Sequence, residues 1–169
     1  MFLLLYIILI MQTCQEKCCH YFLKPYVGPY SFHRHEYDKI NHKIKKAGCF
    51  IYHNDKVLLV QSRGQFWGSP KGTMKENETP LKCAIREVKE ETGIEIDEKE
   101  CVDTIIIKGR AQYYFIEMEE KEVHIQEEDT ENDANGIGWF RLGCLKGNEK
   151  FILNQNCRML IKQRFGIDL

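Results

Sequence analysis

From residue 47 onward, apolar residues come in short runs that are separated by turn residues. The runs at residues 47–53 ("AGCFIYH") and 56–62 ("KVLLVQS") are rich in β-branched and aromatic residues, and Asn54 and Asp55 stand between them. Two such runs around a short polar turn predict a β-hairpin. The next segment, residues 65–72 ("QFWGSPKG"), predicts a short strand that runs into a loop rich in Gly and Pro.

A helix is predicted from Thr79 to Thr92. Thr79 can cap it, and Pro80 fits the first helical position, where its missing N–H is not needed. Gly93 is a natural residue to end it. Apolar side chains recur at i, i+3, i+4 and i+7, which is the spacing of one buried helix face: Leu81, Ala84, Ile85 and Val88.

Further strands are predicted at residues 102–109 ("VDTIIIKG"), 111–119 ("AQYYFIEME") and 136–142 ("GIGWFRL"). The segment 150–165 predicts a final amphipathic helix, with apolar residues at Phe151, Ile152, Leu160 and Ile161. Strands and helices mix without a regular βαβ alternation. The expected fold is therefore α/β, an α/β/α sandwich with a mixed central sheet flanked by two helices.

The first 45 residues do not fit this pattern, so we expect a lead-in of unknown role (1–45) before one domain (46–169). The apolar start, "MFLLLYIILI", is shorter than the roughly 20 residues of a spanning helix, and it lacks the basic start of a signal peptide. A buried or extended start is one interpretation. Membrane association through residues 2–11 is the alternative.

The chain has eight cysteines, most of them within apolar or periodic segments. We interpret them as reduced thiols of a cytoplasmic chain (the host cytoplasm if the protein is viral) rather than as a disulfide framework. The alternative is a zinc site built from Cys14, Cys18 or Cys19 together with His20, His33 or His35. Neither a C-x2-C pair nor an H-x3-5-H pair occurs cleanly, and an irregular lead-in packed on the domain is the main expectation.

The formal net charge is −1, which gives no global electrostatic reason to bind nucleic acid or membrane. The charge is unevenly distributed, because residues 97–135 hold thirteen acidic and four basic residues. The last predicted helix offers only a thin basic surface for long RNA, made of Lys150, Arg158, Lys162 and Arg164.

Glu87, Glu90 and Glu91 lie within little more than one turn of the predicted helix. Like charges at this spacing each cost a helix about 0.2–0.5 kcal/mol. A solvated charged face is the ordinary interpretation. The alternative is a magnesium site, because hard cations prefer oxygen ligands and commonly share carboxylates with substrate phosphates. Arg86 could then hold a carboxylate with its guanidinium, and Gly72 would let the preceding loop approach the helix.

These residues carry a family resemblance. The Nudix box, G-x5-E-x7-R-E-U-x-E-E-x-G-U with U a bulky apolar residue, is matched without departure by Gly72, Glu78, Arg86, Glu87, Val88, Glu90, Glu91, Gly93 and Ile94. The resemblance covers residues 47 to 165 and implies Mg²⁺- or Mn²⁺-dependent hydrolysis of a nucleoside diphosphate linked to another group.

Carried over residue by residue, the resemblance implies that Glu87, Glu90 and Glu91 bind the metal. Glu87 and Glu91 are expected to be the most sensitive positions for catalysis. Arg86 would orient a glutamate, and Glu78 would help fix the loop. Glu78 and Gly72 are also expected to contribute to substrate binding.

The segment "WGSPKG" is most similar to the catalytic subunit of mRNA decapping enzymes and to Nudix proteins of large DNA viruses. This resemblance implies capped RNA as the substrate, with Lys71 as a phosphate-binding charge and no specificity for DNA. Decapping enzymes place an acidic general base six positions before a tryptophan. Asp133 stands six before Trp139, with Glu131 close by. A solvated loop lysine and a solvated acidic loop remain the alternatives.

Trp67, Phe66, Tyr113 and Tyr114 are the candidates for stacking on a base, and packing in the core is the alternative for each. Two other functions stay open. One is a small-molecule pyrophosphatase for dinucleoside polyphosphates, nucleotide sugars or diphosphoinositol phosphates. The other is a non-catalytic nucleotide-binding module, which the presence of all three glutamates disfavours.

Overall fold

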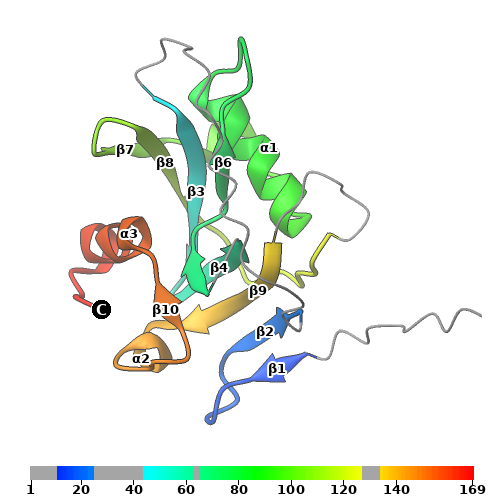
Figure 1. Ribbon diagram of the computed structural model, residues 1–169, viewed down its shortest axis with the longest axis vertical. Coiled ribbons are helices and arrows are strands. Elements are labelled where there is room, and N and C mark those ends of the chain that lie inside the picture. The colour runs from blue at the N-terminus through cyan, green and yellow to red at the C-terminus, as the bar shows by residue number, and fades with distance from the viewer. Residues whose placement is uncertain (1–10, 25–43, 63–64, 127–133) are drawn as a thin grey trace, which may run out of the picture.

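The computed structural model of the chain describes residues 11–24, 44–62, 65–126 and 134–169 (Figure 1). Its elements in chain order are β1 (Gln12–Thr13), β2 (His20–Leu23), β3 (Lys46–His53), β4 (Lys56–Ser62), β5 (Phe66–Gly68), β6 (Lys71–Thr73) and α1 (Pro80–Thr92). They continue with a 3₁₀ helix (Glu98–Glu100), β7 (Asp103–Ile107), β8 (Ala111–Glu117), β9 (Ala134–Arg141), α2 (Leu142–Leu145), β10 (Ile152–Leu153) and α3 (Gln155–Phe165).

The strands form one mixed sheet with the order β1-β2-β9-β4-β3-β8-β7. β3 forms the predicted hairpin with β4, and Asn54 in the turn adopts a φ of 52°. From Lys46 to Tyr52, β3 also pairs in parallel with β8, and its first three residues pair with β6. The sheet is therefore mixed, as the sequence predicts.

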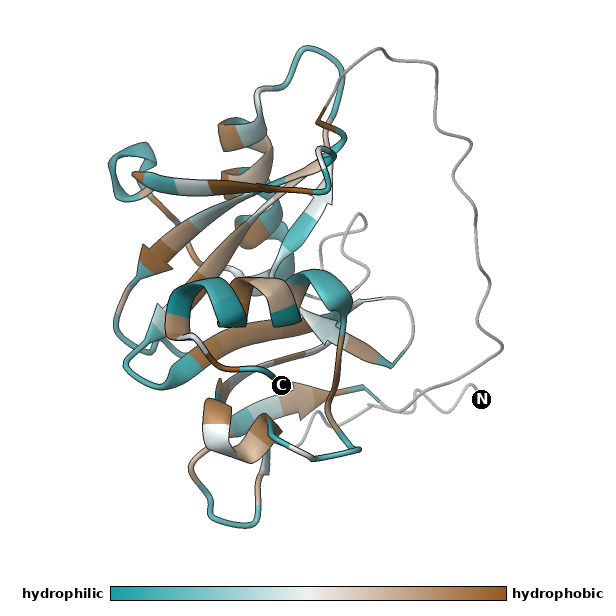
Figure 2. Cartoon of the chain, turned by 90° about the vertical axis from the view of Figure 1, so that its left-hand side faces the viewer, coloured by the Kyte–Doolittle hydropathy of each residue, from teal (hydrophilic) through white to brown (hydrophobic). Residues whose placement is uncertain are grey.

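Both faces of β3 are covered, which explains why its sequence is a continuous apolar run. Phe50 and Tyr52 belong to one core cluster, whereas Cys49 and Ile51 belong to the other. The first cluster is closed by three residues of α3: Cys157, Leu160 and Ile161. The second is closed by residues of α1: Cys83, Ala84 and Val88. Figure 2 shows α3 in front of the strands, and the two helices complete the predicted α/β/α sandwich.

The structure confirms the predicted helix and both of its ends. The Thr79 side chain accepts a hydrogen bond from the Lys82 N–H at 3.3 Å, and Pro80 is the first helical residue. Gly93 has a φ of 75°, and its N–H donates to the Lys89 carbonyl at 2.9 Å. These contacts satisfy backbone groups that a helix end leaves without a partner inside the helix.

Two expectations about irregular and helical segments are corrected. Residues 71–73, expected to lie in a loop, form β6 against β3. The last helix begins at Gln155, so Phe151 and Ile152 precede it, and Ile152 pairs in β10 with Phe66 of β5. The reason is local: the Asn154 side chain accepts the Cys157 N–H at 2.9 Å and caps the helix there.

The described part of the lead-in, residues 11–24, is not irregular. β1 and β2 form an antiparallel hairpin, and β2 pairs with β9 from His20 opposite Trp139 to Leu23 opposite Gly136. The division predicted between residues 45 and 46 therefore does not separate residues 11–24 from the sheet. Residues 2–10, considered for a membrane contact, lie outside the described residues. Within the part of the chain that the structure describes, no helix is both long and apolar enough to cross a membrane.

Candidate active site

Gly72 brings β6 against the acidic side of α1. A Cβ built on Gly72 would lie 1.9 Å from the carboxylate carbon of Glu87, far closer than two non-bonded atoms can approach. A second glycine in β3 serves the same approach, because a Cβ on Gly48 would lie 2.2 Å from the Pro70 carbonyl oxygen. The two glycines let β3, β6 and α1 pack closely enough to place the Glu87 carboxylate directly on the strand.

Arg86 holds three of the carboxylates together. Its Nε and Nη2 donate to the two oxygens of Glu78 at 2.8 and 2.9 Å, a bidentate pair. Its Nη1 donates to Glu87 at 2.7 Å and to Glu90 at 2.9 Å. Nη2 also donates to the Thr73 carbonyl at 3.2 Å, which ties the guanidinium to β6. One half-buried guanidinium therefore offsets the repulsion that these glutamates would otherwise exert on one another.

The ionisation of Glu78 reflects this pairing. The hydrogen bonds from Arg86 lower the pKa of the Glu78 carboxyl, although its burial acts in the opposite direction. The Lys75 N–H also donates to this carboxylate at 2.9 Å and lowers the pKa further. Glu78 is thus a charged anchor that joins the loop before α1 to Arg86.

Glu91 is held separately from the other carboxylates. It is 3% exposed, and its two oxygens accept from the Lys71 N–H at 2.9 Å and from the Ser62 hydroxyl at 3.4 Å. These donors belong to β6 and to the end of β4, so the last turn of α1 is fastened to the sheet through this carboxylate.

The donor set fits a hard divalent cation. Arg86 holds the carboxylates of Glu78, Glu87 and Glu90, and Lys75 lies 3.8 Å from Glu90. Carboxylate oxygens are the donors that Mg²⁺ and Mn²⁺ favour. The residues that would hold the ion are Glu87, Glu90 and Glu91. Their carboxylates lie on both sides of the β6–α1 contact: Glu87 and Glu90 are turned to Arg86, and Glu91 is turned to β4 and β6.

A pocket of about 320 Å³ adjoins Glu91. Two of its lining residues, Ser62 and Lys71, are the residues that donate to the Glu91 carboxylate. Its walls come from β4, from the β5–β6 segment and from the start of α3: Val60, Ser62, Phe66, Gly68, Ser69, Lys71, Asn154, Gln155 and Asn156. The pocket combines amide and hydroxyl groups with one exposed aromatic ring, a composition that suits a nucleotide.

Of the four aromatic residues predicted as candidates for stacking on a base, one lies at the pocket and three lie in the core. Phe66 is 55% exposed and lines the pocket. Trp67 is 1% exposed and packs edge-on against Tyr21 and Phe140, so the expectation that it contacts substrate is corrected. Tyr113 and Tyr114 are also buried. Successive strand residues face opposite sides, and the sequence alone did not show which of the two adjacent rings points outward.

Of the remaining predicted site residues, Lys71 lies on the wall of the pocket and Gly72 lies against Glu87. Asp133 and Glu131, the two candidates for the general base, lie outside the described residues. The residues that sequence reasoning missed are Ser62 and the amides at the start of α3: Asn154, Gln155 and Asn156. An asparagine before a helix is a capping signal that could have found Asn154. Ser62 carries no comparable signal.

Comparison with known proteins gives consistent matches. The family model described as NUDIX domain matches residues 42–155. The putative hydrolase 111R of Invertebrate iridescent virus 3 is 33% identical over 118 residues, which are 69% of this chain and 70% of that protein. The m7GpppN-mRNA hydrolase dcap-2 of Caenorhabditis elegans is 33% identical over 95 residues, which are 52% of this chain and only 12% of that protein.

Among solved structures, the MutT NUDIX hydrolase from Burkholderia pseudomallei is similar with a TM-score of 0.52 and 24% identity. The similarity covers 70% of this chain and 95% of that one. It concerns the fold.

Proposed function

Because this chain belongs to the Nudix hydrolase family, we propose that it is an Mg²⁺- or Mn²⁺-dependent pyrophosphohydrolase that removes the cap from 5′-capped RNA and releases 7-methyl-GDP. The observation that carries the proposal is the double hydrogen bond at Glu91. It fastens the helix with the metal-binding glutamates to the same two residues, Ser62 and Lys71, that line the pocket. A bound diphosphate would thus lie between the pocket and the carboxylates.

The choice of capped RNA is supported by likeness in sequence. The m7GpppN-mRNA hydrolase of C. elegans is 33% identical over 95 residues of this chain. The chain spans 12% of the decapping enzyme's length, so the regulation and partners of that longer protein do not transfer with the match.

Each residue of the candidate site that the structure describes has a role in this proposal. Glu87, Glu90 and Glu91 would hold the divalent ion, which supplies charge neutralisation at the phosphates and a more acidic water. Arg86 keeps Glu87 and Glu90 in place, and Glu78 keeps Arg86 in place. Lys71, on the wall of the pocket, offers a point charge for a phosphate oxygen. Phe66 offers an exposed ring on which a base can stack.

The proposed general base is Asp133, with Glu131 as the alternative. Asp133 immediately precedes Ala134 in the chain. Ala134 begins β9 and pairs with Ser62 at an irregular point of the β4–β9 ladder. Ser62 in turn donates to Glu91. A carboxylate at the position of Asp133 would accept a proton from the water that attacks the phosphate.

The basic residues of α3 and Lys150 before it are partly engaged within the protein, which limits how RNA would be held. The Arg164 guanidinium stacks on the Tyr52 ring at 4.5 Å, and Lys162 pairs with Asp168 at 2.8 Å. Lys150 donates to the Tyr21 hydroxyl at 2.8 Å. We therefore expect the RNA to be held mainly by its capped 5′ end, with a weak dependence of binding on salt.

The same observation favours a second candidate function, a pyrophosphatase for small molecules such as dinucleoside polyphosphates, nucleotide sugars or diphosphoinositol phosphates. Such a substrate needs the pocket and the metal site but no basic track along the surface. The non-catalytic module is disfavoured because all three glutamates are present and positioned.

The test offers cap-labelled RNA, free cap dinucleotide and diadenosine tetraphosphate to the purified protein with Mg²⁺ or Mn²⁺. Release of 7-methyl-GDP from RNA supports decapping. Cleavage of the small molecules alone supports the second candidate, and no cleavage of any substrate contradicts both.

Glu91→Gln should abolish the activity, and Glu95→Gln is the matched control. Glu95 lies just beyond α1 and pairs with Lys89 at the surface. Equal loss of activity in the two variants would contradict the assignment of Glu91 to the site.

A further inference from the structure

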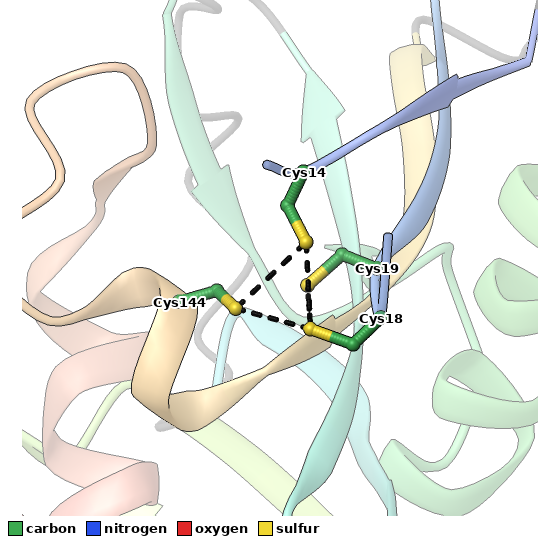
Figure 3. A group of neighbouring side chains, drawn as sticks. All are labelled: Cys14, Cys18, Cys19 and Cys144. Carbon is green, nitrogen blue, oxygen red and sulfur yellow. Dashed lines mark hydrogen bonds between the residues drawn. The ribbon is translucent and has the colours of Figure 1, made fainter. Parts of the chain in front are cut away.

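Four cysteine side chains converge at the end of the molecule away from α1 (Figures 1 and 3). Cys14, Cys18 and Cys19 come from the turn between β1 and β2, and Cys144 comes from α2. Their sulfur atoms all lie within 4.8 Å of one another. Among the residues that the structure describes, this is the one group of three or more His, Cys, Asp or Glu side chains whose ligand atoms meet in this way.

The distances between the sulfurs are close to those around a single zinc ion, and two of them are shorter by about 0.4–0.6 Å. Zinc–sulfur bonds of about 2.3 Å in a tetrahedron place the sulfurs about 3.8 Å apart. Here Cys18 lies 3.4 Å from Cys14 and 3.2 Å from Cys144, and Cys144 lies 3.9 Å from Cys14. Cys18 and Cys19 are 3.9 Å apart. The space holds one ion and is too small for a cluster of several iron and sulfide atoms. We propose that Cys14, Cys18, Cys19 and Cys144 form a structural Zn²⁺ site.

The surroundings of the sulfurs support a metal rather than a chance gathering of thiols. The backbone N–H of Arg141 donates to the Cys19 sulfur at 3.2 Å, a type of contact that fixes a thiolate ligand. Lys17 adopts a φ of 56°, and its N–H donates to the Cys14 carbonyl at 3.0 Å. This tight turn brings Cys14 back toward Cys18. Four protein ligands leave no open position, which is the form of a structural zinc site rather than a catalytic one.

The site would fix the lead-in onto the catalytic domain. β1 has two residues, and a short hairpin of this kind has little stability of its own. Cys18 and Cys144 are 126 residues apart in sequence, so a shared ion closes a long loop of the unfolded chain. β2 carries Tyr21, which packs against Trp67 and Phe151 in the core. Zinc would thereby support the core beneath β5, the strand whose Phe66 lines the pocket.

The sequence pointed to part of this site and could not complete it. Cys14, Cys18, Cys19 and His20 were candidates for zinc, but His20 is exposed and does not belong to the group. The fourth ligand, Cys144, comes from a distant segment that reaches the turn only because β2 pairs with β9, the strand that leads into α2. His33 and His35 lie outside the described residues.

The experiment measures metal in the full chain, expressed with zinc and purified without chelator. Elemental analysis should find about one zinc ion per chain, and replacement by Co²⁺ should give the visible absorption of a tetrahedral cobalt thiolate. Cys144→Ser should lose most of the bound zinc and the cobalt spectrum, and its thermal unfolding should no longer respond to a chelator. Cys101→Ser is the control, since Cys101 is a half-buried free cysteine outside the group.

Where Cys144→Ser fails to fold, the same measurements on Cys14→Ser replace it, since Cys14 lies near the chain's start and is half-buried. Three outcomes overturn the proposal. The first is that the wild-type chain binds neither zinc nor cobalt. The second is that Cys101→Ser loses as much metal as Cys144→Ser. The third is that peptide mapping without reductant finds the four cysteines joined in disulfides. None of these readouts depends on hydrolytic activity, so they separate this proposal from the proposed function.

Discussion

The Cα of Gly72 lies directly beneath the carboxylate of Glu87, so closely that any side chain at position 72 would occupy the place of that carboxylate. The glycine that begins the Nudix box is therefore required by the close packing of β6 against α1. It acts together with Arg86, which holds the other side of the same carboxylate at 2.7 Å.

Gly72→Ala should lower kcat/KM by at least about 10-fold, the effect expected when a metal ligand loses its support. The methyl group would displace the Glu87 carboxylate, whereas β6 can keep its pairing with β3. Kinetics at saturating Mn²⁺, together with thermal unfolding, measure the two effects separately. Gly143→Ala is the control, because a Cβ on Gly143 meets nothing within 4 Å. Full activity of Gly72→Ala would show that Glu87 works from another position.

Glu78→Gln should reveal a pH-dependent contribution to stability. Arg86 lowers the pKa of Glu78 in the folded protein, against an unfolded value of about 4.3. The folded state therefore binds the proton less readily, and the stabilisation is complete above about pH 4.3 and is lost as the pH falls through the lower folded pKa. The difference in free energy of unfolding between wild type and variant should be constant above that range and shrink below it.

Urea denaturation of both proteins between pH 7 and pH 3 measures this difference. Glu76→Gln is the control, because Glu76 is an exposed glutamate in the same loop. A difference that stays constant down to pH 3 would mean that the Glu78–Arg86 pair does not couple to protonation.

The sequence predicted best those features that are encoded within a few residues of one another. Thr79, Pro80 and Gly93 specify the ends of α1 locally, and the structure has both ends where they were expected. Most strands from β3 to β9 were also found from their own composition, with β6 as the exception. The start of α3 was placed too early, because apolar residues of β10 continue the helical spacing up to the capping residue Asn154.

What the sequence could not give depends on contacts between distant segments. Nothing near residues 20–23 indicates that they pair with residues 136–139. The same holds for the link between Cys144 and the β1–β2 turn. The choice between Phe66 and Trp67 at the pocket is similar, because it depends on which face of β5 is covered by Tyr21, Phe140 and Phe151.

Phe66→Ala should weaken substrate binding without harming the fold. Stacking of a base on an aromatic side chain contributes about 1–3 kcal/mol, so KM should rise by about 5-fold or more while kcat changes little. Phe66→Trp should retain the low KM. The control is Ile152→Ala, which removes a partly exposed apolar side chain from the strand paired with β5. An unchanged KM in Phe66→Ala would place the base elsewhere in the pocket.

Gly138→Ala should detach the β1–β2 hairpin from the sheet. A Cβ on Gly138 would lie 2.5 Å from the His20 carbonyl oxygen and 2.3 Å from the Tyr21 Cβ, and β2 can relieve both contacts only by moving away from β9. Loss of this pairing exposes the backbone of residues 20–23. Hydrogen exchange should therefore become faster in residues 11–24 than in α1, and limited proteolysis should cut there first.

Gly143→Ala is again the matched control, since it lies in α2 beside Cys144 and its Cβ is unobstructed. If the four cysteines bind zinc, added metal should slow exchange in residues 11–24 of the Gly138→Ala variant, because the ion holds the turn to α2 independently of the strand pairing. Equal protection of residues 11–24 in the wild type and the Gly138→Ala variant, with and without a chelator, would show that the hairpin is held by neither contact.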